Sequence, residues 1–204
     1  MIFKEIKSFC VNLDRRRDRW ESVQKEFEKI GLAPQRVSAM EGCPPEGNMT
    51  WNQTSCLNSH KKIWQMMVDS DIKIAAIFED DVVFSSDFHG VVNESISEIP
   101  KEWELLNLHS THAGVTSIGR YTNVIVKNLW GSHGYILKKK GTERLLPLAR
   151  HMDGALSSGF AENGGIPYGI KEEWTVCFQR GEDSDIPETQ QLGFWKEFIK
   201  KHWR

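Results

Sequence analysis

Three adjacent carboxylates interrupt an apolar segment in the first half of the chain. Residues 74–78 and 82–84 are apolar, and Glu79, Asp80 and Asp81 stand between them. A short apolar run of this kind is typical of a buried strand, and acids at its end would lie where the sheet opens. Because side chains alternate along a strand, Glu79 and Asp81 are expected on one face and Asp80 on the other.

These three negative charges would repel one another at short range unless water or a cation lies among them. Mg²⁺ and Mn²⁺ prefer oxygen ligands and commonly bridge a protein carboxylate to a phosphate. We therefore predict a metal–diphosphate site, with Mn²⁺ or Mg²⁺ as the cofactor and with Glu79 and Asp81 as its ligands. A solvated acidic turn is the alternative that these residues leave open.

A run of arginines follows the first expected strand, residues 8–13. Guanidinium groups suit phosphate oxygens and carbonyl groups, and the amides at the start of a helix add positive potential. Arg15, Arg16 and Arg19, together with Asn12 at the end of the strand, are therefore candidates for binding a nucleotide diphosphate. A solvated run of charge is the alternative.

Strands and helices are expected to alternate along the chain. The expected strands are residues 8–13, 36–40, 74–84, 103–108, 122–126, 131–137 and 174–178. The expected helices are one capped by Asp14 and ended by Gly31, one capped by Thr54 or Ser55 that runs to Met67, residues 87–99, residues 138–152 with a kink or end at Pro147, and residues 190–204. Residues 42–52 and 153–169 are expected as loops, and residues 122–126 and 131–137 as a hairpin or a mixed sheet edge. The alternation predicts one α/β domain over residues 1–204, with a mostly parallel central sheet flanked by helices and with sites at the carboxyl ends of its strands.

Composition narrows the class of protein. The chain has 204 residues and a formal net charge of −2, so no overall basic field argues for a nucleic-acid partner. Its four cysteines are scattered without a CxxC pair, and the pattern indicates neither a signal peptide nor a transmembrane segment. A reducing cytoplasm with free cysteines is the expected setting.

Several motifs occur in the order of a known family. They are residues 11–16 with Asp18 and Arg19, then Ala39 and Gly42, Cys56 with Ser59 and His60, residues 78–82, Gly131 with Tyr135, and Gln179 with residues 184–186. Over residues 6–187 this order resembles glycosyltransferase family 25, which includes lipooligosaccharide and collagen galactosyltransferases. The arginine motif and the acidic triplet contribute most to the resemblance, because either alone is weak and their order is specific.

The resemblance implies a GT-A, Rossmann-like fold and inverting transfer of a sugar, expected to be galactose, from a UDP-sugar to a glycan or a lipid-linked saccharide. It implies that the acidic triplet is the metal site, that Ser59 and His60 contact the donor or support the metal site, and that Asp80 and Gly131 contact the donor. A hydrogen bond within the core is the alternative for His60. Residues 51–56 depart from the family's Gly-Glu-x-Gly-Cys approach to its Ser-His helix, which leaves the acceptor open.

An inverting transferase needs a base that takes the proton of the acceptor hydroxyl. Asp153 and Asp185 are the carboxylates outside the triplet that best suit this role. A helix N-cap is the alternative for Asp153, and a hydrogen bond within the C-terminal turn is the alternative for Asp185.

The expected C-terminal helix, residues 190–204, is amphipathic. Its apolar stripe consists of Leu192, Trp195, Phe198, Ile199 and Trp203. Basic residues lie elsewhere, and such a helix can rest on an anionic membrane near a lipid-linked acceptor. Packing onto its own domain is the alternative. The expected location is therefore cytoplasmic, with peripheral contact to a membrane as an option.

Two other functions use similar residues. A metal-dependent phosphohydrolase would also place clustered acids at the end of a strand, but it normally needs a second cluster for a second metal, which the sequence does not offer. A non-catalytic nucleotide-sugar-binding module would keep the fold and lose the chemistry, and the intact triplet and Arg15 count against it.

Overall fold

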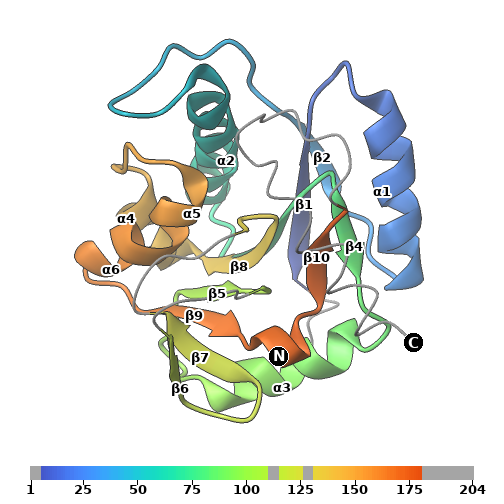
Figure 1. Cartoon of the computed structure of the whole chain (residues 1–204), viewed down its shortest axis with the longest axis vertical. Coiled ribbons are helices and arrows are strands. Elements are labelled where there is room, and N and C mark those ends of the chain that lie inside the picture. Colours follow the sequence, from blue (N-terminus) through green and yellow to red (C-terminus); the bar gives the residue numbers. More distant parts are fainter. Residues whose placement is uncertain (1–5, 110–114, 126–130, 181–204) are drawn as a thin grey trace.

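A mixed sheet of eight strands runs through the computed structural model, which describes residues 6–109, 115–125 and 131–180 (Figure 1). The strands lie in the order β2-β1-β3-β8-β5-β9-β7-β6. Their bounds are β1 Lys7–Asn12, β2 Gln35–Ser38, β3 Ile74–Glu79, β5 Leu105–Asn107, β6 Val115–Ser117, β7 Thr122–Ile125, β8 Gly134–Lys138 and β9 Pro167–Ile170. The pairings make β8 and β7 run against the other strands of this sheet. The predicted α/β class with a mostly parallel central sheet is confirmed.

Helices cover both faces of the sheet. They are α1 Arg17–Lys29, α2 Trp51–Asp69, α3 Phe88–Glu98, α4 Lys139–Leu145, α5 Met152–Gly154 and α6 Phe160–Glu162. On one face, Trp64 of α2 shares a buried cluster with Phe9 and Ile77 of β1 and β3. On the other face, Phe27 of α1 packs edge-on against Phe78, with the ring centroids 5.3 Å apart. Figure 1 accordingly shows α2, α4 and α5 on one side of the sheet and α1 on the other.

The start of α2 differs from the prediction. Thr50 caps the helix, because its hydroxyl accepts from the amide of Gln53 and the Gln53 side chain accepts from the amide of Thr50. This reciprocal pair is a capping box, which satisfies two amides at once. The hydroxyls of Thr54 and Ser55, the caps that the sequence predicted, accept instead from amides of the preceding loop. The helix therefore begins about one turn earlier than expected.

Asp14 does not cap α1, contrary to the prediction. The N-cap is Arg16, and no side chain serves it as a cap. Asp14 accepts hydrogen bonds from Arg36 Nη2 over 2.7 Å and from Ser38 Oγ over 2.9 Å, so it fastens its loop to β2. The predicted end of the helix is confirmed, since Gly31 follows the last turn with a φ of 66°.

The sequence predicted β8 in a hairpin with β7 or at a mixed sheet edge, and both predictions are wrong. Strand β8 lies between β3 and β5 and runs antiparallel to both. The pairing partners of β7 are β6 and β9. The helix that follows β8 ends at Leu145, before Pro147, which confirms the predicted effect of the proline.

Residues 153–169, expected as a loop, contain regular structure. They hold most of α5, a π-helical turn over Ala155–Gly159, α6 and the start of β9. The prediction of a loop was wrong because Leu156 and Phe160 are fully buried and pack this segment onto the core. The expected strand 174–178 is displaced to β10 Cys177–Gln179, which pairs with β4 Val82–Phe84 in a separate sheet. The expected helix 190–204 lies outside the described residues.

Glu98, at the end of α3, fastens the turn before β7. Its carboxylate accepts hydrogen bonds from the amides of Arg120 (2.7 Å) and Tyr121 (2.9 Å) and from the Thr122 hydroxyl (2.6 Å). Burial alone would raise the pKa of Glu98, but the bonds from Thr122 and the amides hold it below the ordinary value of 4.5. This contribution to stability is therefore present above the ordinary pKa and is lost as the pH falls through the lower pKa of the folded state.

We expect Glu98→Ala to lower the free energy of unfolding by about 1 kcal/mol at pH 7, because two amides lose their acceptor at a site that water partly screens. Glu98→Gln keeps an acceptor, is the matched control and should lose less. Urea denaturation at pH 7 and pH 2.5 measures both variants. A Glu98→Ala penalty of the same size at both pH values would contradict a role for the charge.

Candidate active site

Asp80 and Asp81 form the turn that joins β3 to β4. Because β3 ends at Glu79, the predicted alternation of faces does not extend across the triplet. Both aspartates face Arg19 of α1: Arg19 Nη1 lies 3.1 Å from Asp80 Oδ1, and Nη2 lies 3.2 Å from Asp81 Oδ2. The prediction that Asp80 faces away from Asp81 is therefore wrong, since the chain turns where it was expected to continue straight.

Asn12 holds Asp80 from the neighbouring strand. Its Nδ2 donates to Asp80 Oδ2 over 2.6 Å, and its Oδ1 accepts from Arg36 Nε over 2.8 Å. β1 and β3 are parallel neighbours, so their carboxyl ends bring both side chains to the same edge of the sheet. Burial raises the pKa of Asp80 to about 6, although Arg19 and Asn12 favour the charged form.

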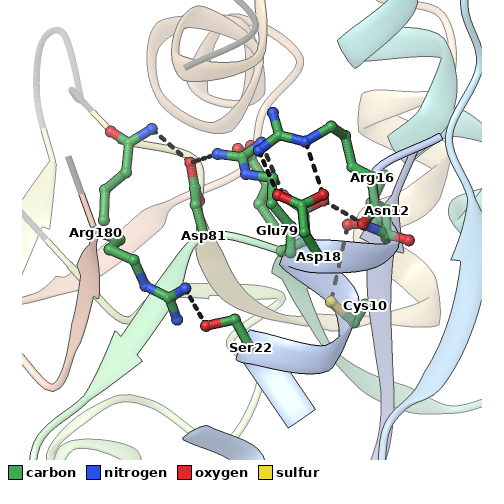
Figure 2. A network of polar contacts seen from close by, with 12 residues as sticks. Cys10, Asn12, Arg16, Asp18, Ser22, Glu79, Asp81 and Arg180 are labelled. Carbon is green, nitrogen blue, oxygen red and sulfur yellow. Dashed lines mark hydrogen bonds and ion pairs between the residues drawn. The ribbon is translucent and has the colours of Figure 1, made fainter. Parts of the chain in front are cut away.

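Asp81 has one oxygen that lacks a donor. Its Oδ2 accepts from Gln179 Nε2 over 2.9 Å as well as from Arg19, but its Oδ1 is buried without a hydrogen-bond partner among the described residues. Burial and the charge of Glu79 raise the pKa of Asp81. Figure 2 shows Asp81 among polar side chains from β1, α1 and the end of β10. An anionic oxygen without a donor in a covered acidic cluster suits a hard cation, so the residues fit Mn²⁺ or Mg²⁺.

Glu79 has different partners from the two aspartates. Ser132 Oγ donates to Glu79 Oε1 over 3.0 Å, and His60 Nε2 lies 3.5 Å from the same oxygen. Burial alone would raise the pKa of Glu79, but the interactions with His60, His133 and Ser132 outweigh burial and lower it. The pKa of Glu79 is therefore shifted in the opposite direction from the pKa values of the two aspartates.

His60 is fully buried and belongs to a hydrogen-bonded chain through the core. The Tyr135 hydroxyl lies 2.8 Å from His60 Nδ1 and accepts from Trp64 Nε1 over 2.9 Å. With Nδ1 engaged, Nε2 is the nitrogen that faces Glu79. This is the core hydrogen bond that the sequence left open as the alternative for His60. Contact between His60 and the nucleotide-sugar donor stays a prediction.

Asp153 and Gly131 contact each other at the same cluster. The Asp153 carboxylate accepts from the amide of Gly131, and burial, assisted by the charge of Glu79, raises the pKa of Asp153. Gly131 has a φ of 103°, and an added Cβ would lie 2.6 Å from the His133 ring, so only glycine fits. The N-cap of α5 is His151, so the N-cap alternative for Asp153 is wrong.

The remaining arginines lie along the start of α1. The Arg16 side chain is largely covered and pairs with Asp18, with Nη2 2.9 Å from Oδ2 (Figure 2). Arg15 is about half exposed and pairs with Glu41, with Nε 2.8 Å from Oε1. Arg19 thus contacts both aspartates of the acidic turn, and Arg15 and Arg16 form pairs with Glu41 and Asp18, respectively.

Ser59 has a structural environment. Its hydroxyl accepts from the amide of Met40 over 2.8 Å and donates to the carbonyl of Ser55 over 2.7 Å, which ties the loop after β2 to α2. Its predicted donor contact stays a prediction. Asp185, the second candidate base, lies outside the described residues.

Four residues at this cluster were not predicted as site residues. They are Cys56, Ser132, Tyr135 and Gln179. Cys56 lies one helical turn before His60, and this spacing alone could have indicated a shared helix face. The other three depend on contacts between distant segments, which no local pattern indicates.

We expect Asp80→Asn to stabilise the metal-free protein at pH 7.5. Because the pKa of Asp80 is raised, the carboxyl favours the folded state below its ordinary pKa of 3.8, and this contribution is lost as the pH rises through about 6. The variant should therefore gain on the order of 1–3 kcal/mol of unfolding free energy at pH 7.5 and little at pH 4. Urea denaturation in EDTA measures this, with Asp69→Asn, an exposed acid of α2, as the control. An equal change in unfolding free energy at pH 7.5 and pH 4 would contradict the raised pKa of Asp80.

Comparison with known proteins gives a consistent family. The family model described as Glycosyltransferase family 25 (LPS biosynthesis protein) matches residues 5–157. A glycosyltransferase 25 family member of Drosophila pseudoobscura pseudoobscura is 28% identical over 123 residues, which are 48% of this chain and 19% of that protein. A probable inactive glycosyltransferase 25 family member 3 of Bos taurus is 25% identical over 186 residues, 74% of this chain and 30% of that protein. Procollagen galactosyltransferase 1-A of Xenopus laevis is 22% identical over 175 residues, 72% of this chain and 28% of that protein.

The chain thus spans less than a third of the length of these relatives. The range matched by the family model includes Arg19, the acidic triplet and Asp153 and covers most of the chain. On this match, the chain belongs to glycosyltransferase family 25.

Proposed function

We propose that this chain is a metal-dependent inverting glycosyltransferase that moves galactose from UDP-galactose to a glycan or a lipid-linked saccharide. Membership of the family supports transfer chemistry, and procollagen galactosyltransferases among the relatives support galactose. The metal dependence rests on one observation, the buried Asp81 Oδ1 that lacks a hydrogen-bond partner among the described residues. It lies at the carboxyl end of parallel strands, where open α/β sheets bind ligands.

Asp81 and Glu79 would hold Mn²⁺ or Mg²⁺ beside the donor diphosphate. Both offer carboxylate oxygens, and the lowered pKa of Glu79 keeps it charged. The cation, when bound, neutralises the charge that develops on the leaving diphosphate. Arg19 contacts both aspartates, so it keeps the turn in place and balances its charge before the donor arrives.

Arg16 and the first turn of α1 would receive the diphosphate. α1 begins at Arg17, close to the acidic turn, and the first amides of a helix have no partner within it. Asp80, already oriented by Asn12, would accept hydrogen bonds from ribose or sugar hydroxyls. Arg15 pairs with Glu41 at the surface and would contribute mainly positive potential.

Asp153 would act as the base. Its raised pKa makes it a stronger proton acceptor than an ordinary aspartate. The acceptor oxygen forms its bond to the anomeric carbon as the bond to UDP breaks, and the hydroxyl proton passes to Asp153. Asp185 is the alternative base.

Asp81→Asn keeps the shape of the side chain and removes the charge that would balance the cation. We expect metal-dependent binding of UDP-galactose to collapse and turnover to fall about a hundredfold or more, because stabilisation of leaving-group charge supplies several kcal/mol. Calorimetric titration with and without Mn²⁺, and release of UDP, measure the two effects. Asp69→Asn is the control and should behave as the wild type. If the Asp81→Asn protein binds UDP-galactose with unchanged Mn²⁺ dependence, the assignment of Asp81 as a metal ligand is wrong.

Asp153→Asn should separate chemistry from binding. We expect kcat to fall by about 10²–10⁴, the usual contribution of a general base, while the Kd for UDP-galactose stays within twofold of wild type. Circular dichroism checks that the fold is retained. An unchanged kcat would exclude Asp153 as the base and transfer the role to Asp185, for which Asp185→Asn is the matching variant.

The same assays distinguish the other functions. Phosphate release from simple esters would indicate a phosphohydrolase, and nucleotide-sugar binding without turnover would indicate a binding module. No helix in the described part of the chain is long and apolar enough to cross a membrane. We further propose a cytoplasmic location, with residues 190–204 as a peripheral contact to the membrane that carries the acceptor.

A further inference from the structure

One sulfur, one nitrogen and one oxygen ligand converge beside the acidic turn. Cys56 Sγ, a ring nitrogen of His60 and a carboxylate oxygen of Glu79 all lie within 4.8 Å of one another. Cys56 and His60 are one turn apart on α2, so their side chains share one face of the helix. Glu79 ends β3, whose buried face packs against that helix.

The His60 ring is already oriented to offer one nitrogen. Its Nδ1 lies 2.8 Å from the Tyr135 hydroxyl, which Trp64 also holds. Its Nε2 is buried, has no hydrogen-bond partner in the described part of the chain, and lies 3.5 Å from Glu79 Oε1. Metal-binding histidines commonly have their second ring nitrogen fixed by another polar group. Nε2 is therefore the nitrogen available to an ion.

The distances allow the three groups to close around an ion with small movements. Zinc ligands at about 2.0–2.3 Å in tetrahedral geometry lie roughly 3.3–3.8 Å from one another. The separation of 3.5 Å between His60 Nε2 and Glu79 Oε1 already falls in that range. The Cys56 residue is partly exposed to solvent.

The chemistry of the three ligands decides which cation fits the cluster. On binding, the divalent ion takes the place of the Cys56 thiol proton, which passes to solvent as the bond between sulfur and metal forms. A mixed sulfur, nitrogen and oxygen set suits Zn²⁺, whereas Mg²⁺ and Mn²⁺ prefer oxygen ligands.

We propose that Cys56, His60 and Glu79 bind one Zn²⁺ ion, at a site distinct from the hard cation assigned to Asp81. Three protein ligands leave the fourth tetrahedral position to water or to an oxygen of a bound molecule. Ser132 and Tyr135 hold Glu79 and His60 from the protein side. Only Glu79 is common to the two sites. Zinc binding by these three side chains needs no nucleotide sugar, so it can be tested whether or not the chain is a transferase.

Co²⁺ reports on such a site because it takes the place of Zn²⁺ and is coloured. Metal-free protein titrated with Co²⁺, without any nucleotide, should bind one equivalent and gain a thiolate-to-cobalt charge-transfer band, which Zn²⁺ then abolishes. Cys56→Ser should remove the band and lower Zn²⁺ affinity at least about 100-fold, more than loss of an outer partner does. Cys43→Ser makes the same change at a buried cysteine outside the cluster and should retain both properties.

Asp81→Asn separates the zinc site from the cation of the donor. It should keep the cobalt band while it loses Mn²⁺-dependent binding of UDP-galactose. The proposal is overturned if the wild type gives no thiolate band, or if the band survives Cys56→Ser. The wild-type titration, with Cys43→Ser beside it, decides the question even if Cys56→Ser does not fold.

Discussion

The pairing of one guanidinium with two adjacent buried carboxylates determines how the rest of the site can be built. Arg19 reaches Asp80 and Asp81 because α1 lies beside the carboxyl ends of β1 and β3 and because the chain turns directly after Glu79. Burial of the two acids costs more than one guanidinium offsets, as the raised pKa of Asp80 indicates. The helices packed on both faces of the sheet supply the stability that this edge lacks. Buried charges that are incompletely balanced, in a fold that is otherwise well packed, are typical of functional sites.

Local patterns were sufficient to predict α1, α3 and β1. They joined β3 and β4 into one strand over residues 74–84, which the turn at Asp80 and Asp81 divides. They were not sufficient for β8, whose place between β3 and β5 depends on pairing between residues far apart in the chain. They also missed β9, because Pro167 and Gly169 are typical of loops although all four residues of this strand are buried. The early start of α2 followed from a capping box that Thr50 and Gln53 complete together.

The same limit applies to the site. The acidic triplet and the arginines were predicted because charge beside an apolar strand can be read from one short segment. The joint pairing of Asp80 and Asp81 was not predicted, since it depends on a two-residue turn that alternation does not foresee. Cys56 and Tyr135 occur in the motifs of the family resemblance, but the sequence does not show what they contact. Tyr135 reaches His60 and Trp64 of α2 because β8 brings it there. Contacts between strands and helices that are distant in the chain therefore could not be predicted from the sequence.

The register of β8 determines which side chains reach the site at this edge of the sheet. Gly134 lies opposite Phe78 of β3, and a side chain there would overlap the Cys177 side chain of β10 unless Cys177 or the strand moved. A slip of one residue would exchange the two faces of the strand, because side chains alternate with a period of two. Tyr135 would then point away from α2, and Ser132 would leave Glu79. Such a change of register in one strand would keep the same strands in the sheet. It would separate Tyr135 from α2 and Ser132 from Glu79 at the same time.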